Sequence, residues 1–147
     1  MTDSFPTADR NRVRRRSQRG NYNRETVHAI LDEARVCHVG FSVDEQPYVI
    51  PTIHVRMGDA LYLHGSAANR MMTTLAAGGR ACVTVTLIDG LVLARSAFHH
   101  SMEYRSAIVF GTARAVTDHD EKLQALEHIV ERWIRSAFSR LRSSLGT

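Results

Sequence analysis

The sequence lacks several residue patterns, and each absence excludes a class of protein. Only two of its 147 residues are cysteines, Cys37 and Cys82. Both lie in apolar, strand-like segments, so we expect buried free thiols rather than a disulfide. No CxxC or CxxH spacing is present, and we expect no metal site. No apolar run approaches the roughly 20 residues that span a bilayer, and the N-terminus lacks the apolar stretch of a secretory signal. We therefore expect one cytoplasmic domain that binds no membrane.

The positive charge of the chain is concentrated near its N-terminus. The formal net charge is +4, but seven of the 19 basic residues fall between Arg10 and Arg24. This leaves 12 basic residues, against 13 acidic ones, in residues 25–147. We interpret residues 1–22 as a disordered, Arg-rich arm and residues 23–147 as the folded domain. No aromatic residue that could stack on a base lies between Arg12 and Arg19, so we do not expect nucleic acid as a partner.

Hydrophobic periodicity predicts mostly strands, with a helix near each end. Asn23 can cap a helix whose apolar residues recur at i, i+3, i+4 and i+7. From Val36 the period changes to two, which is typical of strands. Further strands are predicted at 48–57, with Pro51 indicating an edge, a bulge or a break in the barrel, and at 60–64, 81–87, 91–96 and 105–117. Tight turns are predicted at Gly58-Asp59 and Asp89-Gly90, a bulge at Gly111, and a short helix at 66–77. A capping box at 118–121 precedes a helix whose apolar stripe we expect in the core: Leu123, Leu126, Ile129, Val130, Trp133 and Ile134.

This order of elements contains frequent hairpin turns and little room for parallel crossovers. The predicted fold is mainly β within the α+β class, an antiparallel barrel with flanking helices.

Three polar clusters are candidate sites. At His64–Arg70 a strand ends and a helix begins, an arrangement that suits a phosphate. The alternative there is an ordinary capped helix with a surface arginine. Three strand histidines (His38, His54 and His64) could hold a metal, but no carboxylate lies at ligand spacing. The segment 99–106, HHSMEYRS, could bind an anion or a flavin edge, or form a polar loop at a dimer seam. No GxSxG motif accompanies Ser101, which argues against a hydrolase.

Four segments in order resemble the flavin-binding split β-barrels related to pyridoxamine 5′-phosphate oxidase. They are CHVGF (37–41), QPYVIPT (46–52), LYLHGSAANRM (61–71) and ARSAFHHSMEYRS (94–106). The resemblance covers about residues 20–130 and is to the branch that includes nitroimidazole-resistance proteins. It implies a split-barrel homodimer with FMN at the subunit interface.

The resemblance also implies site residues. The strand Ile50–Val55, which includes His54, would face the flavin ring, largely through backbone groups of Pro51, Thr52 and Ile53. Ser66, Asn69 and Arg70 would hold its phosphate, and Tyr104, Arg105 and Ser106 would approach it from the other subunit. His64 matches a histidine beside the flavin that is proposed to take part in the redox chemistry.

The chain also departs from this family. The oxidase has arginine and lysine on the second strand, where this sequence has Ile50 and Val55, and its C-terminal basic residues have no counterpart after Trp133. We therefore do not expect oxidation of pyridoxamine phosphate. A further strand and tail implied by the resemblance are missing, so residues 23–147 are interpreted as a domain shortened at its C-terminus.

The expected function is that of an FMN-dependent oxidoreductase acting on a small aromatic or nitro compound. No Rossmann glycine pattern indicates a fixed nicotinamide cofactor. Two alternatives stay open: a related barrel that binds a deazaflavin or a haem, with His38, His54 or His64 as haem ligand, and a non-enzymatic binding module recruited through the Arg-rich arm.

Overall fold

The chain is represented by a computed structural model that describes residues 3–144, without the side chains of residue 97 and residues 135–144. Residues 1–2 and 145–147, the outer ends of the expected arm and domain, lie outside the described residues. The elements in chain order are the 3₁₀ turn η1 (Ser17–Arg19), α1 (Arg24–Glu33), β1 (Val36–Val43), β2 (Gln46–Met57), β3 (Ala60–Leu63), α2 (Arg70–Ala76), β4 (Arg80–Val92), the 3₁₀ turn η2 (Ala97–His99), β5 (Ser101–Thr112) and α3 (His119–Ser144).

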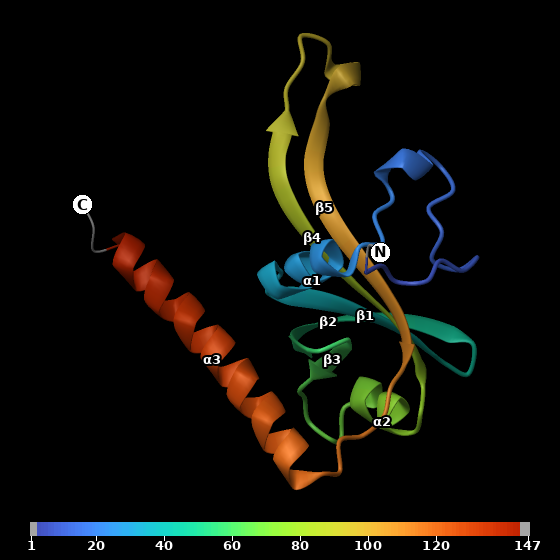
Figure 1. Ribbon diagram of the computed structural model, residues 1–147, viewed down its shortest axis with the longest axis vertical. Coiled ribbons are helices and arrows are strands. Elements are labelled where there is room, and N and C mark those ends of the chain that lie inside the picture. Colours follow the sequence, from blue (N-terminus) through green and yellow to red (C-terminus); the bar gives the residue numbers. More distant parts are fainter. Residues whose placement is uncertain (1–2, 145–147) are drawn as a thin grey trace.

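The strands form one five-stranded sheet in the order β3-β2-β1-β4-β5 (Figure 1). Every neighbouring pair is antiparallel. The predicted antiparallel architecture with helices outside is therefore confirmed. Pro51 lies in β2 where β3 does not reach, since β3 pairs only with His54–Met57. Pro51 thus lies in a part of β2 that has a free edge, as the sequence predicts.

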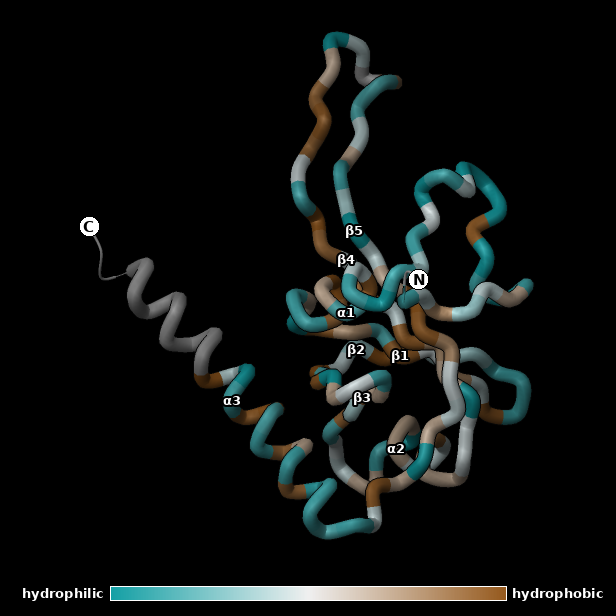
Figure 2. Tube along the Cα trace, viewed as in Figure 1, coloured by the Kyte–Doolittle hydropathy of each residue, from teal (hydrophilic) through white to brown (hydrophobic). Residues whose placement is uncertain are grey.

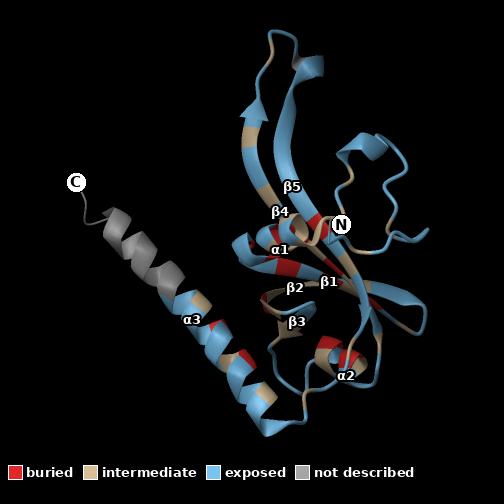
Figure 3. Ribbon diagram, in the orientation of Figure 1, coloured by how far each residue is buried: buried red, intermediate tan, exposed pale blue. Residues whose placement is uncertain are grey.

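One face of the sheet carries the core, and we call it the inner face. Cys37, Val39 and Phe41 of β1 are buried there, because side chains alternate along a strand. Residues of β4 and β5 continue this face, and α1 and α2 cover it. The helices contribute Ile30, Leu31, Ala34, Met71 and Leu75 to the same cluster (Figure 3).

The opposite face, which we call the outer face, is open over much of its area. The strand register places on it Val36, His38, Gly40, Val49, Pro51, Ile53, Cys82, Thr84, Thr86, Ile88, Tyr104, Ser106, Ile108 and Phe110. Six of these are large apolar or aromatic residues that remain exposed: Val36, Val49, Ile88, Tyr104, Ile108 and Phe110. Both cysteines are free, and burial raises the pKa of the Cys37 thiol to about 11.

β4 and β5 form a long hairpin, and here two sequence predictions are wrong. Asp89-Gly90 is not a turn, because β4 continues through it with a register shift between Ile88 and Gly90. Gly90 instead lies at a bulge, a position that glycine also favours. The bulge predicted at Gly111 is absent, since this residue pairs regularly with Ala81.

Two helices also differ from their predictions. α2 begins at Arg70 rather than at residue 66, because the Asn69 side chain caps it by accepting from the Met71 N–H at 2.9 Å. In α3 the expected core stripe is largely exposed. Among its described side chains only Ala125 and Ile129 are buried, and Val130 lies about 100° around the helix from Ile129. No described helix is long and apolar enough to cross a membrane.

The N-terminal arm runs beside α1 and makes specific contacts. The Phe5 N–H donates to the Tyr22 carbonyl at 2.8 Å, and the Val13 N–H donates to the Tyr22 hydroxyl at 2.8 Å. The Arg24 guanidinium lies 4.2 Å from the centre of the Phe5 ring. The division of the chain at residues 22 and 23 stays a prediction.

Candidate functional site

β2 separates the predicted flavin residues onto two faces of the sheet. Pro51 and Ile53 lie on the outer face, paired with His38 and Val36 of β1. Thr52 lies on the inner face, opposite Cys37. The side chains of Pro51 and Ile53 are thus the ones that a ligand on the outer face would meet, whereas Thr52 could contribute only its backbone there.

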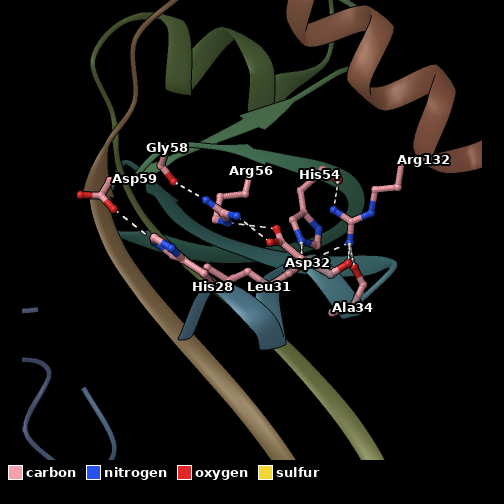
Figure 4. A network of polar contacts seen from close by, with 9 residues as sticks. All are labelled: His28, Leu31, Asp32, Ala34, His54, Arg56, Gly58, Asp59 and Arg132. Carbon is pink, nitrogen blue, oxygen red and sulfur yellow. Dashed lines mark hydrogen bonds and ion pairs between the residues drawn. The ribbon is translucent and has the colours of Figure 1, made fainter. Parts of the chain in front are cut away.

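His54 is buried rather than displayed to a ligand. Its side chain is 1% exposed, and Nε2 donates to the Leu31 carbonyl at 2.9 Å (Figure 4). Because a carbonyl only accepts, Nε2 carries the proton and Nδ1 is left with a lone pair and no partner. Burial lowers the pKa of His54. This histidine is therefore a neutral core residue that joins β2 to α1.

The three predicted residues of β5 also divide by face. Tyr104 and Ser106 lie on the outer face, opposite Ile88 and Thr86 of β4. Arg105 lies on the inner side, where its guanidinium donates to Glu33 of α1 at 2.8 and 3.0 Å and to Asp89 of β4 at 2.9 and 2.7 Å.

The four contacts of Arg105 tie the hairpin to α1. Hydrogen bonds from this guanidinium lower the pKa of both carboxyls, Glu33 and Asp89. All three side chains remain partly exposed, so the ion pairs hold the geometry more than they add stability. In the described arrangement, Arg105 is occupied by protein carboxylates.

Arg70 is different, because its charge is not paired with a carboxylate. Its guanidinium lies 4.9 Å from the centre of the Tyr48 ring, which connects the start of α2 to β2. No salt bridge involving Arg70 occurs among the described residues. A cation held by an aromatic ring and otherwise exposed can accept an anionic ligand.

The rest of the predicted phosphate loop is exposed and partly used by the fold. The Ser66 hydroxyl accepts from the Ala68 N–H at 3.4 Å, and the side-chain oxygen of Asn69, Oδ1, caps α2. The Asn69 side-chain NH₂ group donates no hydrogen bond within the described chain. His64 follows β3 and is exposed. With only seven residues in α2, the charge of Arg70 carries more of the phosphate argument than the helix end does.

His99 and His100 lie at the far end of the hairpin, away from this loop (Figure 1). His100 Nδ1 accepts from the Ala94 N–H at 3.0 Å, so this histidine shapes the hairpin tip. Among the described residues no group of three or more His, Cys, Asp and Glu side chains could hold a metal.

The sequence reasoning missed a polar network around Arg132 of α3 (Figure 4). Its guanidinium donates to the carbonyls of Leu31 and Asp32 at 3.1 and 3.0 Å, to that of Ala34, and to the His54 carbonyl at 3.1 Å. It therefore satisfies the free carbonyls at the C-terminus of α1. The one sequence signal was an arginine three residues after Ile129, on the buried side of the helix.

The outer face and the Arg70 loop fit a flavin in chemical terms. The face offers a flat apolar surface with hydroxyls at Thr84, Thr86 and Ser106, which suits a ring system with a polar edge. The loop offers an unpaired cation for a phosphate.

Comparisons with known proteins place the chain in one family. A model of the pyridoxamine 5′-phosphate oxidase family matches residues 23–145. No curated protein matches the chain.

Three solved structures are similar to this chain. The flavocytochrome Anf3 from Azotobacter vinelandii is 39% identical with a TM-score of 0.77, and the match covers 85% of this chain and 58% of that one. An FAD and haem binding protein from Mycobacterium smegmatis is 37% identical with a TM-score of 0.71, covering 80% and 57%. A protein from Bacteroides thetaiotaomicron, described as a 5-nitroimidazole antibiotic resistance protein, is 29% identical with a TM-score of 0.62, covering 75% and 66%.

This chain thus spans less than two thirds of each of these structures. Their strand arrangement agrees with the five-stranded antiparallel sheet found here. The chain therefore belongs to the pyridoxamine 5′-phosphate oxidase family of flavin-binding split barrels.

Proposed function

We propose that this chain is a flavin-binding redox protein whose flavin ring lies against the outer face of the sheet. The observation that carries the proposal is the exposed apolar surface on that face, which includes Ile88, Ile108 and Phe110. Ile108 and Phe110 are neighbours on this face of β5, and large apolar side chains that gather exposed on one face mark an interaction site. Pro51 and Ile53 would contact the ring from β2.

The phosphate of the flavin would be held by the loop before α2. Arg70 would supply the charge, because among the described residues its guanidinium contacts the Tyr48 ring and forms no salt bridge. Ser66 and the free NH₂ group of Asn69 would add hydrogen bonds. His64, at the end of β3, would lie beside the ring and exchange a proton with the substrate at an imidazole nitrogen.

A second copy of the chain would complete the site. The family resemblance brings Tyr104 and Ser106 from the other subunit, and both lie on the outer face. Packing two outer faces together would cover their exposed apolar side chains and exclude water from the ring. The proposed assembly is a homodimer with the flavin in its interface.

The family resemblance implies FMN, whereas one similar structure binds FAD and haem. The proposed site serves either flavin, because both carry the same ring and a phosphate next to the ribityl chain. When bound, the flavin supplies the electron transfer, and the protein binds, orients and shields it. The substrate would be a small aromatic or nitro compound that stacks on the exposed side of the ring.

A second candidate is a flavocytochrome, which carries a haem as well as a flavin. Two of the similar structures favour it, with 37% and 39% identity. Of the three strand histidines, His54 has its Nε2 engaged with Leu31, whereas His38 and His64 are exposed. These two would be the haem ligands.

The visible absorption spectrum of the purified protein tests both candidates, followed by release and identification of any chromophore. Flavin bands with FMN or FAD in the extract are expected. An additional Soret band that is lost in His38→Ala or His64→Ala would favour the flavocytochrome. A colourless protein that takes up neither flavin nor haem would contradict both.

A further inference from the structure

The far end of the β4–β5 hairpin is an apolar surface that no described part of its own chain covers. We call residues 91–102 the hairpin tip. Phe98 is 91% exposed and Leu93 80%, and Leu91, Val92 and Met102 are exposed as well. For the described residues, the hydrogen bonds of the tip join it only to itself. Figure 2 shows the apolar stretch of β4 within this projecting part.

The hairpin extends well beyond the rest of the sheet. Val85 is buried in the core and Leu87 packs against it, so the five residues from Ile88 to Val92 project by about 16 Å at roughly 3.3 Å per residue. Arg105 fixes the base of this projection to α1. The tip is therefore held out from the body, as Figure 1 shows.

α3 presents a second uncovered apolar surface. Its described outward residues, Leu123, Val130 and Ile134, are exposed, Val130 by 53%. Beside them Leu126, Glu127, Val130 and Glu131, all from this one helix, line a wide, open hollow. We call these outward residues and the lining of the hollow the α3 groove. The tip and α3 lie far apart within one chain (Figure 1), so a tip cannot reach the groove of its own chain.

The two surfaces have complementary charge. Arg95 is the one fully charged residue of the tip, which contains no carboxylate. The α3 groove carries Glu127 and Glu131, and neither forms an ion pair with another described residue. Opposite charges at the rim of an apolar contact select the partner and its orientation.

We propose that the hairpin tip of one copy docks in the α3 groove of a second copy, with Phe98 among the apolar residues and Arg95 beside Glu127 and Glu131. The outer face continues onto the tip, because Leu91 pairs with Met102, which lies two residues before Tyr104 on the same side of β5. The docking rests on the pairing of two copies in the proposed function, but it uses no residue of the proposed flavin site. In a two-fold dimer each copy would give one tip and receive one.

Self-association measured by sedimentation velocity tests this contact. Phe98→Ser and Val130→Ser should each weaken the dimer about tenfold to a hundredfold, since each removes one buried apolar side chain. The dimer of the double variant should be no weaker than the dimer of the weaker single variant, because both changes break the same contact. Val13→Ser, a change at an exposed valine of the arm, is the matched control and should leave the dimer unchanged.

Exchanging the charges of Arg95 and Glu131 tests whether these two side chains pair across the interface. Arg95→Glu and Glu131→Arg should each weaken the dimer, and the two together should restore it. Failure of the pair to restore it, or an effect of only one side, would overturn the proposal.

Cross-linking establishes that the contact joins two chains. In a Cys82→Ser background, differently tagged copies carrying Phe98→Cys and Glu127→Cys should form mixed disulfide dimers on oxidation. Cross-links confined to Glu127→Cys with itself would indicate helix-to-helix pairing and overturn the docking.

The flavin content of the same variants separates this proposal from the previous one. Tip and groove variants should keep full flavin occupancy at concentrations where they remain dimeric. Charge rescue in a protein without flavin would leave the docking standing and the proposed function contradicted. Flavin binding, with no effect of the tip or groove variants on the dimer, would leave the proposed function standing and the docking contradicted.

Discussion

Arg70 and Arg105 are both arginines, but their contacts within the protein differ. Arg105 donates to two carboxylates, Glu33 and Asp89. Arg70 has no carboxylate partner and rests on the Tyr48 ring. The family resemblance assigns both to the flavin, and nothing in the sequence distinguishes them, because their partners come from distant segments. The described contacts favour Arg70 as the ligand-binding arginine and Arg105 as a positioning residue for the hairpin.

Arg70→Ala should weaken flavin binding by about 1.5–3 kcal/mol, the range for a hydrogen bond to a charged group. A flavin fluorescence titration measures it. Arg15→Ala, an exposed arginine of the arm with no ion pair, is the matched control and should bind as tightly as the original chain. Equal affinity of the two variants would remove Arg70 from the phosphate site.

We expect His54 to make the free energy of unfolding depend on pH. Its pKa in the folded state is lowered by burial, so the unfolded chain binds a proton more readily. The free energy of unfolding should therefore fall as the pH decreases below the unfolded value of about 6.5. One such proton contributes a slope of at most about 1.4 kcal/mol per pH unit.

Urea denaturation between pH 7.5 and 5 checks this, with His54→Leu as the comparison. The substitution removes the titrating group, so its slope should be smaller than that of the original chain. Identical slopes would show that His54 does not titrate with folding.

At the scale of elements, much of the fold was predictable and the exceptions have physical reasons. β1, β2 and β3 follow from the two-residue period and from Gly58-Asp59, whose turn the structure confirms. The turn predicted at Asp89-Gly90 is wrong because the same residue types also suit a bulge. Whether a turn or a bulge forms depends on the partner strand. Most of α3 was predicted, but amphipathicity does not reveal which partner covers the apolar side.

The candidate site was predictable only in outline. The loop His64–Arg70 and the face of Pro51 and Ile53 follow from motif and strand period. The burial of His54 against Leu31 does not, because it depends on where α1 packs.

We expect Arg132 to attach α3 to α1 and β2, because its guanidinium donates to carbonyls of both. Arg132→Met should lower the free energy of unfolding by about 2–3 kcal/mol, because the carbonyls at the end of α1 lose a charged donor. Arg80→Met, at an exposed arginine of β4, should change it by less than about 0.5 kcal/mol. Urea denaturation compares the two, and an equal loss in both variants would contradict a specific role for Arg132.

At the scale of the whole molecule, the exposed apolar side chains lie where the proposed partner would cover them. The outer face, the hairpin tip and the outward side of α3 are all open in the single chain. One reciprocal pairing of two copies would cover them together.

Ile108→Glu should break this pairing, because Ile108 lies on the outer face opposite Thr84 and a charge there would be desolvated. Sedimentation velocity should report a monomer at concentrations where the original chain is a dimer. Val13→Glu, on the arm, should leave the dimer intact. A dimer that persists unchanged in Ile108→Glu would place the interface elsewhere.

The most direct test of the account is an equilibrium titration of the purified chain, freed of any bound chromophore, with FMN and with FAD. We predict saturable binding of one flavin per chain for at least one of the two, and at least tenfold weaker binding by Ile108→Glu. Failure of the original chain to bind either flavin, or equal binding by Ile108→Glu, would contradict a flavin site on the outer face of the sheet.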